Sequence, residues 1–159
     1  MDMVMYHGTR RLIERFDQEE TVDGGFHFGT YGQAQIRSLG EGQRIIEAKV
    51  SFRRLRRVRD TGGAWREQIE KAKRSGYDAI VYLNRYEGIS LESINRAQAA
   101  GVDLDALSDR EFRQHCPEAR DSLIVFSPQQ IEIIRTHDPK AEDEAQNQAD
   151  PVALPELDL

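Results

Sequence analysis

The chain has 159 residues, enough to bury a hydrophobic core, and this length favours one main domain. It has no apolar run of the roughly 18 residues that a membrane-spanning helix needs, and its first residues lack the pattern of a secretory signal peptide. The single cysteine, Cys116, excludes an internal disulfide and a cysteine-based zinc cluster. We therefore expect a cytoplasmic protein with no membrane partner.

The net charge of −6 comes from one end of the chain. Residues 138–159 contain seven acidic residues and one lysine, whereas residues 1–137 contain 21 acidic and 21 basic residues. The same final segment has three prolines and no aromatic residue, so it cannot bury enough apolar surface to offset the entropy of ordering. The sequence predicts a neutral domain at 1–137 and an acidic disordered tail at 138–159.

The pattern of apolar residues predicts a domain of mixed strands and helices. In chain order, strands are expected at residues 2–6, 24–28, 43–52, 77–83 and 122–126, with an edge strand within 127–136. Helices are expected at residues 9–16, 31–39 and 62–76, and a helical insertion at 89–119. The strands do not alternate with helices as strict βαβ units. The fold class is therefore α+β, with a split, mixed or antiparallel sheet and peripheral helices.

The segment "YHGT", residues 6–9, places a histidine and a glycine after a short apolar run. Gly8 carries no side chain, so a ligand can approach the backbone closely at the end of the first strand. Thr9 supplies a hydroxyl and can cap the helix expected at 9–16. These residues can form a cradle for a polar, partly anionic ligand, although His7 can equally be an ordinary histidine of the core or sheet edge.

A second histidine lies in "GGFHFGT", residues 24–30. Alternation along a strand places His27 on the face opposite Phe26 and Phe28, which is also consistent with simple solvent exposure. The spacings HxH, HxxH and HExxH are absent, and neither His7 nor His27 has a carboxylate nearby at ligand spacing. We therefore expect no metal site.

Four segments occur in an order that resembles the ADP-ribosyltransferase superfamily: "YHGT", "GGFHFGT" with Ala34 shortly after it, "GYDAIVYLNRYEG" and "DSLIVFSPQQIEII". More narrowly, they are similar to small bacterial and phage-associated domains of the diphtheria-toxin and poly(ADP-ribose) polymerase type. The resemblance extends over about residues 4–136. It implies a split antiparallel sheet with a cleft between its halves. It also implies cleavage of the nicotinamide–ribose bond of NAD and transfer of ADP-ribose to an acceptor.

The resemblance also implies roles for individual residues. His7 would hydrogen-bond the adenosine ribose, and the backbone of Gly8 would hold the nicotinamide carboxamide. His27 falls where these enzymes usually carry a tyrosine beside the nicotinamide ring, and Tyr31 is the nearest aromatic residue that could complete the stack. The expected NAD-binding set is His7, Gly8, Thr9, His27, Phe28, Tyr31 and Asn84.

The sequence departs from the family at the catalytic glutamate, because Ser122 occupies the matching position in "DSLIVF". Cleavage of the glycosidic bond develops positive charge on the ribose, and a carboxylate that grips the ribose stabilises it. Glu87, which follows a buried strand, and Asp121 are the two candidates, and Asn84 could orient either one. Their ordinary alternatives are an exposed loop acid and a strand cap.

We therefore expect a mono-ADP-ribosyltransferase that uses NAD as substrate without a metal, in the manner of a bacterial or phage toxin or effector. The alternatives are an NAD glycohydrolase, an enzyme similar to the tRNA 2′-phosphotransferases, which also carry a histidine at the position of His27, and a non-catalytic module that binds NAD or ADP-ribose. The acceptor is expected to be a protein rather than a nucleic acid, since the domain is neutral. An immunity or regulatory partner is also compatible with a toxin.

Two further segments have more than one interpretation. "FRRLRRVR", residues 52–59, is interpreted first as a solvated face with Phe52, Leu55 and Val58 directed inward. Its arginines could instead contact a pyrophosphate, a nucleic-acid acceptor or the acidic tail. The insertion at 89–119 could recognise the acceptor or simply cover the sheet.

Overall fold

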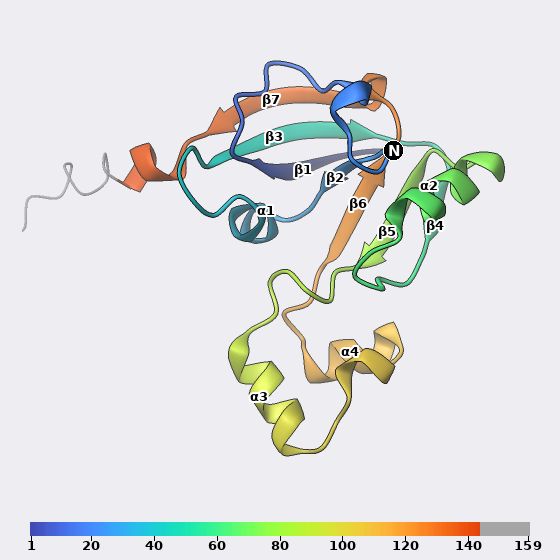
Figure 1. Cartoon of the computed structure of the whole chain (residues 1–159), viewed down its shortest axis with the longest axis vertical. Coiled ribbons are helices and arrows are strands. Elements are labelled where there is room, and N and C mark those ends of the chain that lie inside the picture. Colours follow the sequence, from blue (N-terminus) through green and yellow to red (C-terminus); the bar gives the residue numbers. More distant parts are fainter. Residues whose placement is uncertain (144–159) are drawn as a thin grey trace, which may run out of the picture.

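The computed structural model describes residues 1–143, and within them seven strands form two sheets (Figure 1). The first sheet is antiparallel and has the order β1 (Asp2–Thr9), β3 (Arg44–Ser51), β7 (Ile131–His137). The second has the order β2 (Phe26–Phe28), β6 (Asp121–Val125), β5 (Ala79–Leu83), β4 (Leu55–Arg57). Its pairs are antiparallel except for β4 and β5, which are parallel. The chain is thus a small α+β domain with mixed and antiparallel sheets, as the sequence predicts.

The two sheets meet where β1 passes the end of β2. Tyr6 and Gly29 exchange two backbone hydrogen bonds, of 2.9 and 2.8 Å, and form an isolated bridge between the sheets. Behind this bridge both sheets contribute to one apolar cluster, which includes Met5, Phe26, Phe28, Val50, Leu123 and Val125. Because the bridge holds β1 and β2 together, the two histidines that these strands carry are brought close to one another.

Two helices pack on the sheets. Helix α1 (Tyr31–Arg37) begins at Thr30, whose hydroxyl accepts from the backbone of Gln33 while the Gln33 side chain accepts from the backbone of Thr30. Helix α2 (Trp65–Arg74) buries Ile69 and Ala72 against β5 and β6. Three short 3₁₀ turns are η1 (Gln18–Glu20), η2 (Leu104–Ala106) and η3 (Pro128–Gln130).

Helices α3 (Leu91–Ala99) and α4 (Asp109–His115) form the expected insertion between β5 and β6, and Figure 1 shows them as a lobe at the far end of the molecule from β7. The lobe has its own apolar cluster, made of Leu83, Phe112, Cys116 and Ala119. Arg85 fastens it to the sheet: its guanidinium donates to the backbone oxygens of Leu104 and Leu107 and to Asp109. The guanidinium also lies over the Phe112 ring.

The predicted helix at 9–16 is wrong. Strand β1 continues to Thr9, and the following residues form bends without a helix. Leu12 is 78% exposed, while Phe16 packs edge-on against Phe26 in the core. Leu12 and Phe16 have the spacing of residues on one helix face, but only Phe16 is anchored in the core, so this spacing does not reflect a helix. The hydroxyl of Thr9 accepts from the backbone N–H of Arg11 in a turn and caps no helix.

Two other expectations need adjustment. No strand was expected at 55–57, where β4 pairs with β5, and Leu55 is 38% exposed rather than directed inward. The first residues of the predicted disordered tail are ordered: residues 139–143 form a helical turn at the end of the first sheet, and the Asp138 carboxylate lies 3.4 Å from the Arg44 guanidinium. The rest of the predicted tail and its docking to the arginines lie outside the described residues. Among residues 1–143 no helix has the length and apolar character needed to cross a membrane.

Candidate functional site

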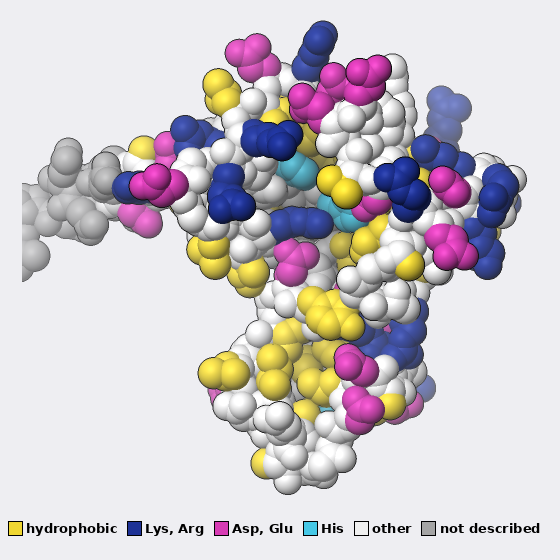
Figure 2. All heavy atoms as spheres, viewed as in Figure 1, with side chains coloured by type: hydrophobic (Ala, Val, Ile, Leu, Met, Phe, Trp, Pro, Cys, Tyr) yellow, Lys and Arg dark blue, Asp and Glu magenta, His cyan; other side chains and the backbone are white. Residues whose placement is uncertain are grey.

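Two pockets on one face of the molecule meet at the side chain of Arg37. The first, which we call the histidine pocket, has a volume of about 300 Å³ and is lined by His7, Thr9, Phe16, Asp23 and His27. The second, the glutamate pocket, has about 490 Å³ and is lined by Trp65, Tyr82, Asn84, Tyr86 and Glu87. Arg37 lines both. Figure 2 shows histidine side chains inside a hollow on this face, between basic side chains.

His7 is a neutral hydrogen-bonding group in the histidine pocket. Its Nδ1 lies 2.7 Å from the backbone oxygen of His27, which can only accept, so Nδ1 carries the proton. Burial lowers the pKa of His7 from 6.5 to about 4, and the charge of Arg37 contributes in the same direction. The ring is therefore uncharged at neutral pH, and its Nε2 presents a lone pair that can accept a hydrogen bond from a ligand hydroxyl.

His27 is oriented by a carboxylate that the sequence analysis did not identify. Its Nε2 donates to Asp23 Oδ2 at 2.7 Å. Burial alone would raise the pKa of Asp23, but the hydrogen bond and charge of His27 outweigh it and hold that pKa below its ordinary value. The other ring nitrogen, His27 Nδ1, is buried and has no hydrogen-bond partner among residues 1–143. This nitrogen is therefore an unsatisfied hydrogen-bonding group of a residue that lines the histidine pocket.

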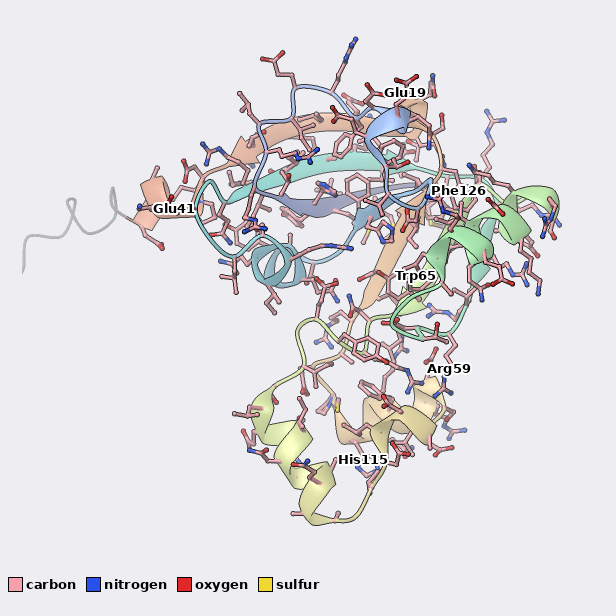
Figure 3. All side chains as sticks on the ribbon, in the orientation of Figure 1. Glu19, Glu41, Arg59, Trp65, His115 and Phe126 are labelled. Atoms are coloured by element: carbon pink, nitrogen blue, oxygen red, sulfur yellow. The ribbon has the colours of Figure 1, made fainter. Side chains whose placement is uncertain are left out.

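Aromatic rings form the wall between the two pockets. The rings of His27 and Trp65 are 6.3 Å apart in an edge-to-face arrangement, and those of Trp65 and Tyr82 are 4.4 Å apart. Figure 3 shows Trp65 at the start of α2, beside the strands of the second sheet. Burial raises the pKa of Tyr82 to about 12, so its hydroxyl stays protonated. The wall can therefore contact a flat ring and offer it one hydroxyl donor.

Glu87 is held in place by a turn that follows β5. The side-chain oxygen of Asn84 accepts from the backbone N–H groups of Tyr86 and Glu87, at 3.1 and 2.8 Å. The amide of Asn84 donates to Glu87 Oε1 at 3.2 Å and to the hydroxyl of Ser122 at 3.0 Å. Gly88 then adopts a φ of +84°, which a glycine tolerates without strain. The hydroxyl of Ser122 is therefore linked through Asn84 to the carboxylate of Glu87.

Asp121 lies outside both pockets, on the opposite side of the second sheet. Arg57 donates to both of its carboxylate oxygens, at 3.0 and 2.7 Å, and Arg113 donates to one at 3.0 Å. The hydrogen bond from Arg57 holds the pKa of Asp121 below its ordinary value, and the charges of both arginines contribute. This geometry favours Glu87 over Asp121 as the carboxylate available to a ligand.

Three other residues of the expected binding set have different surroundings. A Cβ on Gly8 would lie 2.1 Å from the backbone oxygen of Ala34, so the space beside Gly8 is filled by α1 rather than left for a ligand. Phe28 is buried in the core. Tyr31 packs against Tyr6 and His137 and lines neither pocket.

Arg37, the last residue of α1, is a further candidate that the sequence analysis missed. Within residues 1–143 its side chain forms no ion pair and no hydrogen bond, although its charge lowers the pKa of both His7 and Tyr82. An unpaired guanidinium between two pockets can bind an anionic group such as a phosphate. Its position after "GGFHFGT" at the end of a short helix was the available signal.

Residues 1–143 contain no group of three or more histidine, cysteine, aspartate or glutamate side chains arranged to hold a metal ion. Comparisons of the sequence with models of protein families and with curated proteins found no match. The site has a neutral histidine acceptor, a histidine with a buried unpaired nitrogen, an unpaired arginine, an aromatic wall and a half-buried glutamate.

Proposed function

We propose that the chain is an ADP-ribosyltransferase that binds NAD across the two pockets, in a cleft between two sheets of the type that the sequence resemblance implies. One observation carries the proposal: Asn84 presents the carboxylate of Glu87 in a pocket that Arg37 joins to the histidine pocket. Such a pair of pockets matches a dinucleotide, which has a charged diphosphate between two ribosides. Each pocket is of the size found for small-molecule sites.

The proposed placement assigns one part of NAD to each group. The Nε2 of His7 accepts a hydrogen bond from a hydroxyl of the adenosine ribose, and Arg37 binds the diphosphate. The nicotinamide lies against the wall of His27, Trp65 and Tyr82, with its ribose toward Glu87. The neutral state of His7 supports this placement, because a charged ring would donate rather than accept at Nε2.

The chemistry follows from the charge that develops on the ribose. As the bond between C1′ and the nicotinamide nitrogen breaks, its electron pair leaves with nicotinamide, which departs neutral, and positive charge develops on the ribose. Glu87 stabilises this charge and grips the ribose hydroxyls. The lone pair of the acceptor then bonds to C1′, and the acceptor loses a proton to Glu87 or to water. Glu87 also borders a cavity of about 730 Å³ beside α1, through which an acceptor can approach.

The test is release of nicotinamide from NAD by the purified chain, with and without cell lysate. Glu87→Gln is expected to lower the rate about 10²–10³-fold. Glu92→Gln, which changes an exposed glutamate on α3, is the matched control and is expected to leave the rate unchanged. Stimulation of the release by lysate would indicate a transferase with a macromolecular acceptor.

Other outcomes would overturn parts of the proposal. Release that survives in Glu87→Gln and is lost in Asp121→Asn would move the catalytic role to Asp121. Release that needs no acceptor and yields free ADP-ribose would indicate an NAD glycohydrolase. Binding of NAD without any release would favour a non-catalytic module, for which the serine at position 122 is the best argument.

A further inference from the structure

Six basic side chains gather at one corner of the molecule, at the end of α2 and the start of β4. They are Arg53, Arg54, Arg56, Lys71, Lys73 and Arg74, and we call this set the basic surface. Five of the six residues are exposed, and Arg56 is half-buried. In Figure 2 basic side chains crowd the edge of the molecule where Figure 1 places α2 and β4.

The two segments of the basic surface are held together by Tyr77 and Asp78. The carboxylate of Asp78 accepts from the backbone N–H groups of Arg53 and Arg54, at 2.8 to 3.1 Å, and fixes the turn into β4. The guanidinium groups of Arg54 and Arg56 lie over the ring of Tyr77, at 4.6 and 5.7 Å from its centre. These contacts orient the two arginines, so less side-chain entropy is lost when they bind an anion.

The charge of the basic surface is only partly neutralised by the described part of the protein. None of its six side chains forms an ion pair within residues 1–143, whereas the neighbouring Arg57 is paired with Asp121. The carboxylate of Asp78 is bound by backbone N–H groups. Glu67 and Glu70 on α2 lie one helical turn before Lys71 and Arg74, and they reduce the positive charge in part although they form no ion pair with them. Six basic side chains beside three acids still leave a local excess of positive charge. A cluster of unpaired positive charge on a neutral domain indicates a polyanionic partner.

The basic surface and the glutamate pocket lie at opposite ends of the same helix. Trp65 begins α2 in the pocket and Arg74 ends it in the basic surface, a separation of about 14 Å along the helix at the usual rise per residue. At the rim of the pocket the ring of Tyr86 is 57% exposed and lies against Gly62. A flexible polyanion bound at the basic surface can therefore pass an exposed aromatic ring on its way to Glu87.

We propose that the basic surface binds the backbone of single-stranded nucleic acid and that Tyr86 stacks on one of its bases. Arginine and lysine side chains bind the phosphates, and an exposed ring binds any base by stacking. The aromatic rim favours nucleic acid over an acidic peptide, which has no bases to stack. The sequence favoured a protein acceptor because the net charge of residues 1–137 is zero. That net charge is a sum over the whole domain, and it does not reveal the local excess of positive charge at the basic surface. That the bound strand is the acceptor of ADP-ribose rests on the proposed function.

The test measures binding of fluorescent oligonucleotides of about 15 nucleotides to the full chain by anisotropy, without NAD and over a range of salt concentrations. Single-stranded RNA and DNA, duplex DNA and a glutamate peptide of matched charge are compared. Single strands are expected to bind most tightly. Two double variants remove basic side chains: Arg54→Gln with Arg56→Gln, and Lys71→Gln with Arg74→Gln. Each should weaken binding and reduce the slope of log K against log salt by about 0.7 for every basic side chain removed.

Two further variants complete the test. The double variant Arg96→Gln with Arg110→Gln removes two exposed basic side chains from α3 and α4 and should leave binding unchanged. Tyr86→Ala should weaken binding of single strands about fivefold or more and affect the glutamate peptide little. The guanidinium groups that lie over Tyr77 belong to Arg54 and Arg56, so the second pair of variants, at Lys71 and Arg74, removes charge without removing a group from that stack.

Several results would overturn the inference: no binding of single strands, equal loss in the Arg96 and Arg110 control, or equal affinity for the glutamate peptide. Tighter binding of duplex DNA with no effect of Tyr86→Ala would overturn the single-strand assignment. Because binding is measured without NAD, a chain that binds oligonucleotides but releases no nicotinamide would refute the proposed function and leave the basic surface standing. A chain that releases nicotinamide but binds no oligonucleotide would refute the inference about the basic surface and leave the proposed function standing.

Discussion

Glu87 and Asp121 lie at the same end of the β5–β6 pair, but their surroundings differ. Asp121 pairs in register with Leu83, four residues before Glu87, and two arginines neutralise its charge. Glu87 is held by the amide of Asn84 and forms no ion pair within residues 1–143. The partners of a carboxylate, rather than its position on the sheet, decide whether its charge supports the fold or is left for a ligand.

The largest expected difference between the two carboxylates is in catalysis. Glu87→Gln should lower nicotinamide release about 10²–10³-fold, since the amide carries no charge to stabilise the ribose. The free energy of unfolding should stay within about 0.5 kcal/mol of the wild type, because a half-buried glutamine can keep the hydrogen bond to Asn84. Urea denaturation of both proteins checks this. A fall in the free energy of unfolding large enough to account for the lost activity would assign Glu87 a structural role instead.

The histidine pocket offers the second test, because His7 is a buried polar group without a countercharge. Its pKa is lowered to about 4, so the unfolded chain binds a proton between pH 6.5 and 4 that the folded chain does not. Stability should therefore fall as the pH drops through this window, by up to about 3 kcal/mol. The unfolding free energy measured in urea at pH 7 and pH 4.5 gives the difference.

The histidine contribution is isolated by two variants. His7→Gln removes the titrating ring and should flatten the pH dependence of stability. His115→Gln, on α4 (Figure 3), should retain it. The pKa of Asp23 is also lowered, but its contribution is lost only as the pH falls below about 3.8, outside this window. Unchanged pH dependence in His7→Gln would contradict the assignment of a buried neutral ring.

Much of the fold could be predicted from apolar patterning. The continuous runs at 77–83 and 122–126 are the buried strands β5 and β6, and alternation at 43–52 is β3. The exception at 9–16 shows the limit of periodicity, because one anchored aromatic gave an apolar spacing like that of a helix. Strand β4 escaped prediction because three residues, two of them arginines, carry little apolar signal.

The candidate site was only partly predictable. His7, His27, Asn84 and Glu87 stand in local segments that the resemblance marks, and the structure brings them to two adjoining pockets. Asp23, Arg37 and Trp65 reach these pockets through tertiary contacts. Asp23 and His27 are four residues apart, a spacing that brings side chains together in a helix. Here the loop before β2 folds back instead, and the Asp23 carboxylate reaches the His27 ring. Trp65 begins α2 and lies half-buried against His27.

Removing the support of Glu87 should have an intermediate effect. Asn84 is 2% exposed and joins Tyr86, Glu87 and Ser122 through four hydrogen bonds. Asn84→Ala leaves the hydroxyl of Ser122 with one partner fewer and frees the turn, and should cost about 2 kcal/mol of stability. Nicotinamide release should fall at least tenfold, since the carboxylate is no longer fixed. Ser122→Ala is the comparison: it should cost less stability and preserve most activity, and equal losses would contradict the role of the turn.

The smallest effect is expected for Asp121→Asn, and it distinguishes the two carboxylates most directly. In the ion pairs with Arg57 and Arg113 the arginine side chains are about half exposed and that of Asp121 is 34% exposed, so the loss of these pairs should cost about 1 kcal/mol or less, and less still at high salt. Because the pKa of Asp121 is lowered, its contribution should be present at neutral pH and lost as the pH falls below about 3.8. Nicotinamide release should stay within about twofold of the wild type at pH 7. A 100-fold loss without unfolding would exchange the roles of the two carboxylates, since it would show that the arginines hold Asp121 for the ligand rather than for the fold.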